Sequence, residues 1–170
     1  MARPDRRGQV FLLNVLPEAR PDPIGLALAL ALAVALGCGD SDVVTHSYGT
    51  HAEAVRAGAV ERGWIPDRLP GGIFEIREAH DLDSNRRWGL FSFRTEDAAA
   101  LSQLLGAEVS VTGETCDPPA RIEWWPRLLR GPLTDAQIAA TGLKVYRPAA
   151  AGLTFAVNWN QRRAYYWSPE

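Results

Sequence analysis

The chain has 170 residues, of which 46% are hydrophobic, and it contains six tryptophans. This composition is sufficient for a packed core and argues against general disorder. The formal net charge is −2, so the chain lacks the basic excess that attracts nucleic acid, and we expect no nucleic-acid partner. Two cysteines, Cys38 and Cys116, are too few for a disulfide framework.

The amino-terminal segment has the pattern of an export signal. Residues 24–38 read IGLALALALAVALGC, with no polar or charged side chain between Ile24 and Leu36. As a helix this run measures about 20 Å, which is short of the roughly 30 Å hydrocarbon core of a bilayer. Arginines precede the run, as they do in a secretory signal peptide.

The end of that run, Ala35-Leu36-Gly37-Cys38, resembles a bacterial lipobox, in which small residues precede a cysteine that becomes lipidated. We therefore expect residues 1–37 to be a lipoprotein-type signal peptide and Cys38 to carry a lipid anchor that attaches the protein to the membrane. An ordinary cleaved signal and an uncleaved helix are the alternatives. If Cys38 is lipidated, Cys116 has no cysteine partner in the mature chain.

The residues that follow Cys38 bear on location and organisation. An aspartate directly after the cysteine would resemble an inner-membrane retention signal, and Gly39 stands there instead. We expect a bacterial cell-envelope protein that faces the periplasm, with the outer membrane favoured. Residues 38–49 are polar enough to predict a tether, and residues 50–170 a globular domain.

The first half of that domain predicts one helix and one β-hairpin. Thr50-His51-Ala52-Glu53 is a capping box, and the helix is expected to run to about Arg62, where Gly63 provides a left-handed stop. Residues 72–79 and 87–94 alternate apolar and polar side chains, which predicts two strands joined by a loop.

The second half predicts two more helices and three strands. Thr95 is a candidate cap for a helix that ends at Gly106, and Thr134 with Gln137 opens a short helix that Gly142 closes. Residues 143–147, 153–159 and 163–167 have strand patterns. This order predicts an α+β fold, with helices packed on one face of an antiparallel sheet in a single small domain.

The run EAHDLDSNRRW, residues 78–88, raises the question of a metal site. Its candidate ligands are His80, Asp81, Asp83 and Asn85, because the alternation of Asp81, Asp83 and Asn85 opens like a calcium loop. However, Arg86 stands where such a loop requires glycine. Asp and Asn also favour turns through bonds to their own backbone, and we predict a turn.

A zinc or acid–base site around His80 would need further ligands. Glu78 and the loop aspartates are near in sequence, whereas His46 and His51 are expected on the tether and the first helical turn. Nothing in their spacing brings these histidines together. A hydrogen-bonded or exposed histidine is the favoured interpretation of His80.

Two adjacent tryptophans, Trp124 and Trp125, are candidates for an exposed platform that binds a sugar or a protein partner. A role in closing the core is favoured. The sequence contains no GxSxG, HExxH or CxxC motif and no phosphate-binding glycine loop. The absence of these motifs disfavours an enzyme without excluding one, and the sequence identifies no catalytic residue and no cofactor.

The segments GWIPDRLP (63–70) and IREAHDLDSNRRWGLFSF (76–93) resemble the head region of small bacterial lipoproteins described as YbbD-like. The resemblance rests on Gly63, Trp64, Pro66, Leu69, Pro70, Glu78, His80, Asp81, Asp83, Asn85, Trp88, Phe91 and Phe93. It implies an envelope lipoprotein with a compact head, and it implies no activity, cofactor or catalytic residue.

The expected function is that of a lipid-anchored module, facing the periplasm, that binds an unidentified protein or cell-wall partner or supports the envelope structure. The alternative is a periplasmic metal-binding protein or metal-dependent enzyme that uses the loop from His80 to Asn85. A binder of cell-wall glycans through Trp124 and Trp125 is a third possibility.

Overall fold

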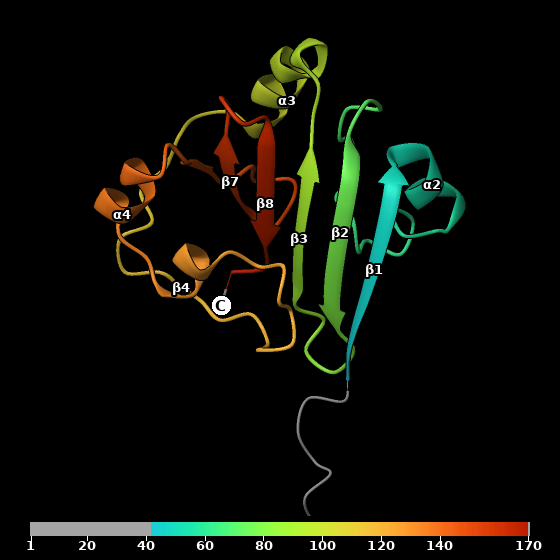
Figure 1. The fold of residues 1–170 in the computed structure, drawn as a ribbon, viewed down its shortest axis with the longest axis horizontal. Coiled ribbons are helices and arrows are strands. Elements are labelled where there is room, and N and C mark those ends of the chain that lie inside the picture. The colour runs from blue at the N-terminus through green and yellow to red at the C-terminus, as the bar shows by residue number, and fades with distance from the viewer. Residues whose placement is uncertain (1–41, 170) are drawn as a thin grey trace, which may run out of the picture. The chain divides into compact units, whose positions relative to one another are not determined.

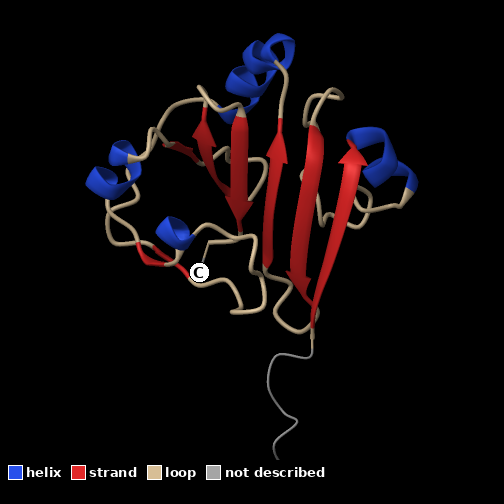
Figure 2. Cartoon of the chain, in the orientation of Figure 1, coloured by secondary structure: helices blue, strands red, loops and turns tan. Residues whose placement is uncertain are grey.

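Six antiparallel strands form the central sheet of the computed structural model, which describes residues 42–169 (Figures 1 and 2). Their order across the sheet is β1-β2-β3-β8-β7-β6. The strands are β1 (Val43–Thr50), β2 (Phe74–Asp81), β3 (Arg87–Ser92), β6 (Lys144–Tyr146), β7 (Thr154–Asn158) and β8 (Arg163–Trp167). The α+β class and the antiparallel sheet are therefore confirmed.

Short helices and a small second sheet complete the described part of the chain. The helices are α2 (His51–Arg56), α3 (Ala98–Leu105) and α4 (Asp135–Ala140), with 3₁₀ turns η1 (Thr95–Asp97) and η2 (Arg127–Leu129). Strands β4 (Thr115–Cys116) and β5 (Gly131–Pro132) pair with each other. None of the helices between residues 42 and 169 is long and apolar enough to cross a membrane.

The predicted tether is wrong from residue 43 onward, because Val43–Thr50 is strand β1. This strand pairs with β2 along its length, from Val43 opposite Asp81 to Thr50 opposite Phe74. As an edge strand it leaves alternate side chains half-buried or exposed. Polar residues are compatible with such a position, so polarity alone did not distinguish this strand from a tether. Residues 38–41 of the predicted tether lie outside the described residues.

The first helix begins where the capping box predicts it and ends earlier. The Thr50 side chain accepts a hydrogen bond from the Glu53 N–H at 3.3 Å, and the Glu53 carboxylate accepts one from the Gly49 N–H at 2.7 Å. Helix α2 stops at Arg56, because Gly58 already takes a left-handed backbone with φ +72°. Gly63 provides a second left-handed turn, with φ +74°, directly before Trp64.

Both faces of the sheet are covered by apolar side chains. Successive side chains of a strand point to opposite faces, and neighbours in β7 and β8 fall into two separate core clusters. Phe155 and Tyr166 belong to one cluster, which also receives Ala54 from α2. Ala156 and Trp167 belong to the other cluster.

The expectation that helices pack on one face is wrong. Helix α4 contributes Ile138 to the cluster that contains Ala156, whereas α3 contributes Leu101 and Leu105 to the cluster that contains Phe155. The strands β6–β8 are buried on both faces. A sheet of this kind needs a cover on each side, and α4 with its flanking segment provides the second one.

Candidate functional site

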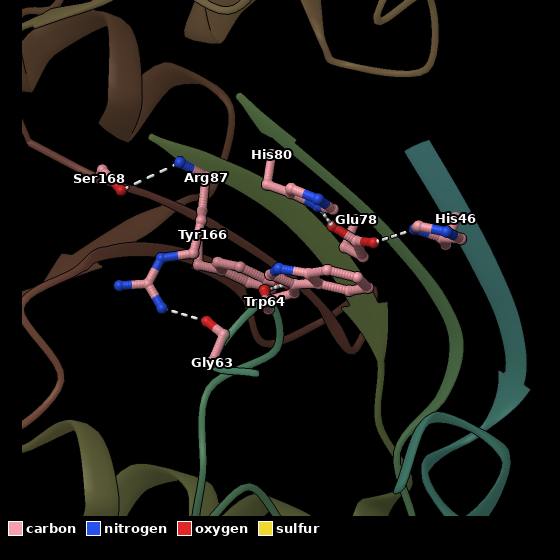
Figure 3. A network of polar contacts seen from close by, with 8 residues as sticks. All are labelled: His46, Gly63, Trp64, Glu78, His80, Arg87, Tyr166 and Ser168. Carbon is pink, nitrogen blue, oxygen red and sulfur yellow. Dashed lines mark hydrogen bonds and ion pairs between the residues drawn. The ribbon is translucent and has the colours of Figure 1, made fainter. Parts of the chain in front are cut away.

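The pairing of β1 with β2 places three ionisable side chains together on one face of the sheet. His46 lies directly opposite Glu78, and His80 follows Glu78 by two residues. Because side chains two residues apart share a face of a strand, the two histidines flank the same carboxylate. We call His46, Glu78 and His80 the His–Glu–His cluster (Figure 3).

Each imidazole contacts a different oxygen of the carboxylate. The His46 Nδ1 atom is 2.5 Å from Glu78 Oε1, and the His80 Nδ1 atom is 3.0 Å from Glu78 Oε2. Glu78 is completely buried, and the side chain of His80 is 4% exposed. The His46 side chain is 37% exposed. The cluster is therefore open to solvent on the side of the edge strand β1.

Trp64 lies against both imidazole rings. Its ring centroid is 4.1 Å from that of His80 and 5.3 Å from that of His46, with interplanar angles of 15° and 8°. The guanidinium carbon of Arg62 lies 4.2 Å from the centroid of Trp64. A guanidinium stacked on an indole is a favourable contact. The indole in turn lies against both imidazole rings and restricts their orientation.

Two side chains from the sheet bind the backbone of the turn formed by Gly63 and Trp64. The Tyr166 hydroxyl donates to the Trp64 carbonyl at 3.0 Å, and the Arg87 guanidinium donates to the Gly63 carbonyl. Figure 3 shows both residues beside the turn. Gly89, which is paired with Glu78 and Tyr166, leaves room for the tyrosine ring. A Cβ atom at Gly89 would lie 2.1 Å from Tyr166 Cζ.

The buried carboxylate also affects two tyrosines. Burial is the main cause that raises the pKa of Tyr166 well above its ordinary value, and the negative charge of Glu78 adds to it. Burial, followed by Glu78, likewise raises the pKa of Tyr48, which Arg62 partly opposes. Both hydroxyls are therefore protonated at neutral pH, and Tyr166 is available as a hydrogen-bond donor.

The loop after His80 is a turn, as predicted. The Asp81 carboxylate accepts hydrogen bonds from the N–H groups of Asp83 and Ser84, both at 2.9 Å, and Asn85 takes a left-handed backbone with φ 55°. These backbone bonds lower the pKa of Asp81, whereas the nearby Asp42 carboxylate is the main cause that raises the pKa of Asp83.

The structure does not bring the four predicted loop ligands together. His80 and Asp81 are successive residues of strand β2, so their side chains point to opposite faces of the sheet. His80 joins His46 and Glu78 instead. The sequence spacing gave no reason to bring His46 and His80 together, and the expected place of His46 on a tether is wrong, because His46 belongs to strand β1. His51 lies outside the cluster, on α2.

The two tryptophans of the predicted platform have different environments. Trp125 is 2% exposed and belongs to the core, where its indole N–H donates to the Leu129 carbonyl at 2.9 Å. It is not available for a ligand. Trp124 is half-buried, and its ring lies edge-on to Trp125 with the centroids 6.0 Å apart.

Trp124 lines an open groove of about 530 Å³. The groove also contains residues from strands β1, β2, β3 and β8, and we call it the Trp124 groove. Its lining includes Ser47, Glu75, Arg77, Leu90, Trp124 and Arg163. Ser47, Arg77 and Leu90 are successive partners across three strands, so they share the face opposite the His–Glu–His cluster.

Sequence reasoning missed His46 and Trp64 as members of a site. One signal was present, since Glu78 and His80 are two residues apart in a predicted strand and must share a face. Recognising His46 required the register between β1 and β2, which joins residues 32 positions apart. The predicted lipidation site, Cys38, lies outside the described residues. Cys116 is buried in the core.

The fold and its two polar features define an α+β domain with a buried His–Glu–His cluster on one face of its sheet and an open groove on the other. Residues 42–92 match the family model of the YbbD head domain. The predicted YbbD-like head region is thereby confirmed for these residues, which include all three members of the cluster. No curated protein and no solved structure shows a significant match to the chain.

Proposed function

We propose that this protein is a lipid-anchored module of the bacterial envelope whose head binds a carboxylate-bearing cell-wall glycan in the Trp124 groove. The volume of the groove, about 530 Å³, lies within the range of about 300–1,000 Å³ that is usual for ligand sites. The observation that carries the proposal is the pairing of a partly exposed tryptophan with charged side chains in this groove.

The chemistry of the groove suits an amphipathic sugar. The half-buried indole of Trp124 offers an apolar surface for the face of a sugar ring, and Leu90 also lines the groove. Arg163 is paired with Glu75 at 2.9 Å. Arg77 is exposed, and its side chain makes no hydrogen bond or ion pair within residues 42–169, so its guanidinium is available to a ligand carboxylate.

The test is a titration of the full chain, purified in detergent micelles, with soluble fragments of cell-wall glycan, followed by tryptophan fluorescence and calorimetry. Trp124→Ala and Arg77→Gln are expected to weaken binding at least about tenfold, because aromatic and arginine anchors dominate interfaces. Arg94→Gln, outside the groove, is the matched control. Absence of binding across the fragments, or equal affinity of Trp124→Ala, would refute the proposal.

The anchor is a separate part of the proposal. It rests on the lipobox-like Ala35-Leu36-Gly37-Cys38. Cys38 precedes the first residue of β1, Val43, by five positions (43 − 38), which span at most about 18 Å of extended chain. A lipid on Cys38 would therefore hold the head close to the bilayer surface, on the periplasmic side of the outer membrane in our proposal.

Metabolic labelling with a fatty-acid analogue tests the anchor. We expect labelled protein in the membrane fraction, and we expect Cys38→Ser to lose both the label and the membrane association. Label that persists in Cys38→Ser would contradict the assignment of Cys38. Cys116→Ser, which changes a buried residue of the core, serves as the control and should retain the label.

A further inference from the structure

We propose that the His–Glu–His cluster is a binding site for a divalent transition metal ion, with Zn²⁺ as the best match. One ligand atom from each of His46, Glu78 and His80 lies within 4.8 Å of the others. Two imidazoles and one carboxylate form a ligand set that is usual for zinc sites with an open position. This site is distinct from the Trp124 groove, and neither proposal depends on the other.

The burial of Glu78 is the first argument. A carboxylate with no exposed surface is costly unless a positive charge or several hydrogen bonds compensate it. Within residues 42–169 the hydrogen-bonding and ion-pair partners of Glu78 are the two histidines, with no arginine or lysine among them. A metal ion bound by the carboxylate and the two imidazoles would supply such a positive charge.

The distances are the second argument. Zinc bonds of about 2.0–2.1 Å in a tetrahedral site place neighbouring ligand atoms about 3.3 Å apart. The two Nδ1 atoms are 2.5 Å and 3.0 Å from the carboxylate oxygens. An outward movement of less than about 1 Å converts these hydrogen-bonding distances into ligand spacings.

The rigid surroundings are the third argument. Trp64 stacks on both imidazole rings, and Tyr166 and Arg87 bind the backbone of the turn that carries it. Groups that orient the ligands of a metal are a usual part of such sites, because they fix the rings before the ion arrives.

Solvent access determines the kind of site. His80 and Glu78 are closed to solvent, whereas the His46 side chain is 37% exposed. With three protein ligands, the fourth position of a tetrahedral ion would face the side of β1 and hold water. We therefore expect the ion to exchange readily with chelators and to accept an added ligand.

The test uses the full chain in detergent micelles, prepared without a histidine tag and treated with a chelator before titration. Calorimetry with Zn²⁺ should give one site per chain, and Co²⁺ should give the intense visible absorption of a four-coordinate ion. An added small anion should change that absorption if the fourth position holds water. Zn²⁺ at about 100 times its dissociation constant should raise the melting midpoint by roughly 10 °C.

Matched substitutions identify the ligands. His46→Gln should weaken binding at least about 100-fold, since even the loss of an outer partner of a zinc ligand costs 10–100-fold. His51→Gln, which changes the only other histidine of the described chain, should leave the affinity unchanged. His46 is half-exposed on an edge strand, so its replacement is compatible with folding, which circular dichroism would check.

Three outcomes would overturn the proposal. The first is absence of stoichiometric Zn²⁺ binding by the unmodified chain, which would leave the cluster as a network of hydrogen bonds. The second is equal binding by His46→Gln and His51→Gln. The third is a Co²⁺ spectrum identical to that of the aqueous ion. Each result is independent of glycan binding, because the groove lies on the other face of the sheet.

Discussion

Gly89→Ala is expected to destabilise the domain, because an added methyl group would collide with the buried ring of Tyr166. Gly89 lies in β3 between Glu78 and Tyr166. A Cβ atom there would lie 2.1 Å from Tyr166 Cζ and 2.3 Å from its hydroxyl oxygen. The ring of Tyr166 is completely buried, so it can move only by displacing its neighbours.

The magnitude follows from two effects. Overpacking a core costs about 1–3 kcal/mol, and loss of the bond from the Tyr166 hydroxyl to the Trp64 carbonyl adds about 0.5–1.5 kcal/mol. We therefore expect a loss of about 2–4 kcal/mol in the free energy of unfolding. For a domain of this size, this corresponds to a fall of roughly 8–16 °C in the melting midpoint.

Urea and thermal unfolding, followed by circular dichroism, measure the effect. Gly71→Ala is the matched control, because a Cβ atom there has no neighbour within 4 Å and the backbone needs no left-handed conformation. Gly71→Ala should shift the midpoint by no more than about 2 °C in either direction. Equal midpoints for the two variants would refute the packing of Tyr166 over Gly89.

Three further predictions concern capping and pH. Thr134→Ala should lower the free energy of unfolding by about 1 kcal/mol, because it removes the side-chain cap of α4. Thr95→Ala should cost less, because η1 has no side-chain cap. Thermal melts of the two variants measure the difference. The raised pKa of Tyr166 contributes stability that is complete below about pH 10 and is lost as the pH rises through the folded value. Tyr166→Phe should therefore be less stable at neutral pH and lose less between pH 8 and alkaline pH, and an equal alkaline loss in urea titrations would contradict this. The lowered pKa of Asp81 acts in the opposite direction, because its stabilisation is present above the ordinary pKa of 3.8 and is lost as the pH falls. The melting midpoint of Asp81→Ala should therefore fall less than that of the unmodified protein between pH 6 and pH 2.5.

The elements that sequence predicted well are those specified by neighbouring residues. Thr50 and Thr134 each accept a hydrogen bond from the N–H three residues later, as their capping boxes predict. Residues 163–167 form a strand with the predicted bounds. In each case the signal and the structure lie within one turn of helix or one run of alternation, so no distant partner is needed.

The elements that sequence failed to predict depend on distant partners. Residues 43–50 are a strand because β2 provides their hydrogen bonds, and a polar edge strand has little pattern of its own. Helix α2 ends at Arg56 because Gly58 adopts a left-handed backbone, although Gly63 offered an equally good stop in the sequence. Trp124 and Trp125 are adjacent, and composition alone could not assign one to the groove and the other to the core.

The candidate metal site follows from one row of residues across the sheet. His46, Glu78, Gly89 and Tyr166 are successive partners on strands β1, β2, β3 and β8. A glycine in a central strand weakens the sheet locally, and it usually indicates close approach of another group. Here the tyrosine ring occupies the space at Gly89, and from that position its hydroxyl donates to the Trp64 carbonyl.

The orientation of both imidazole rings therefore depends on Gly89, because the space at this glycine holds the ring of Tyr166. The ring of Tyr166 fixes the backbone of Trp64, and the indole of Trp64 lies on His46 and His80. A change at Gly89 is therefore expected to loosen the cluster without touching any of its three members. Gly89→Ala should therefore lose both stability and Zn²⁺ affinity. His46→Gln should lose Zn²⁺ affinity with a smaller loss of stability.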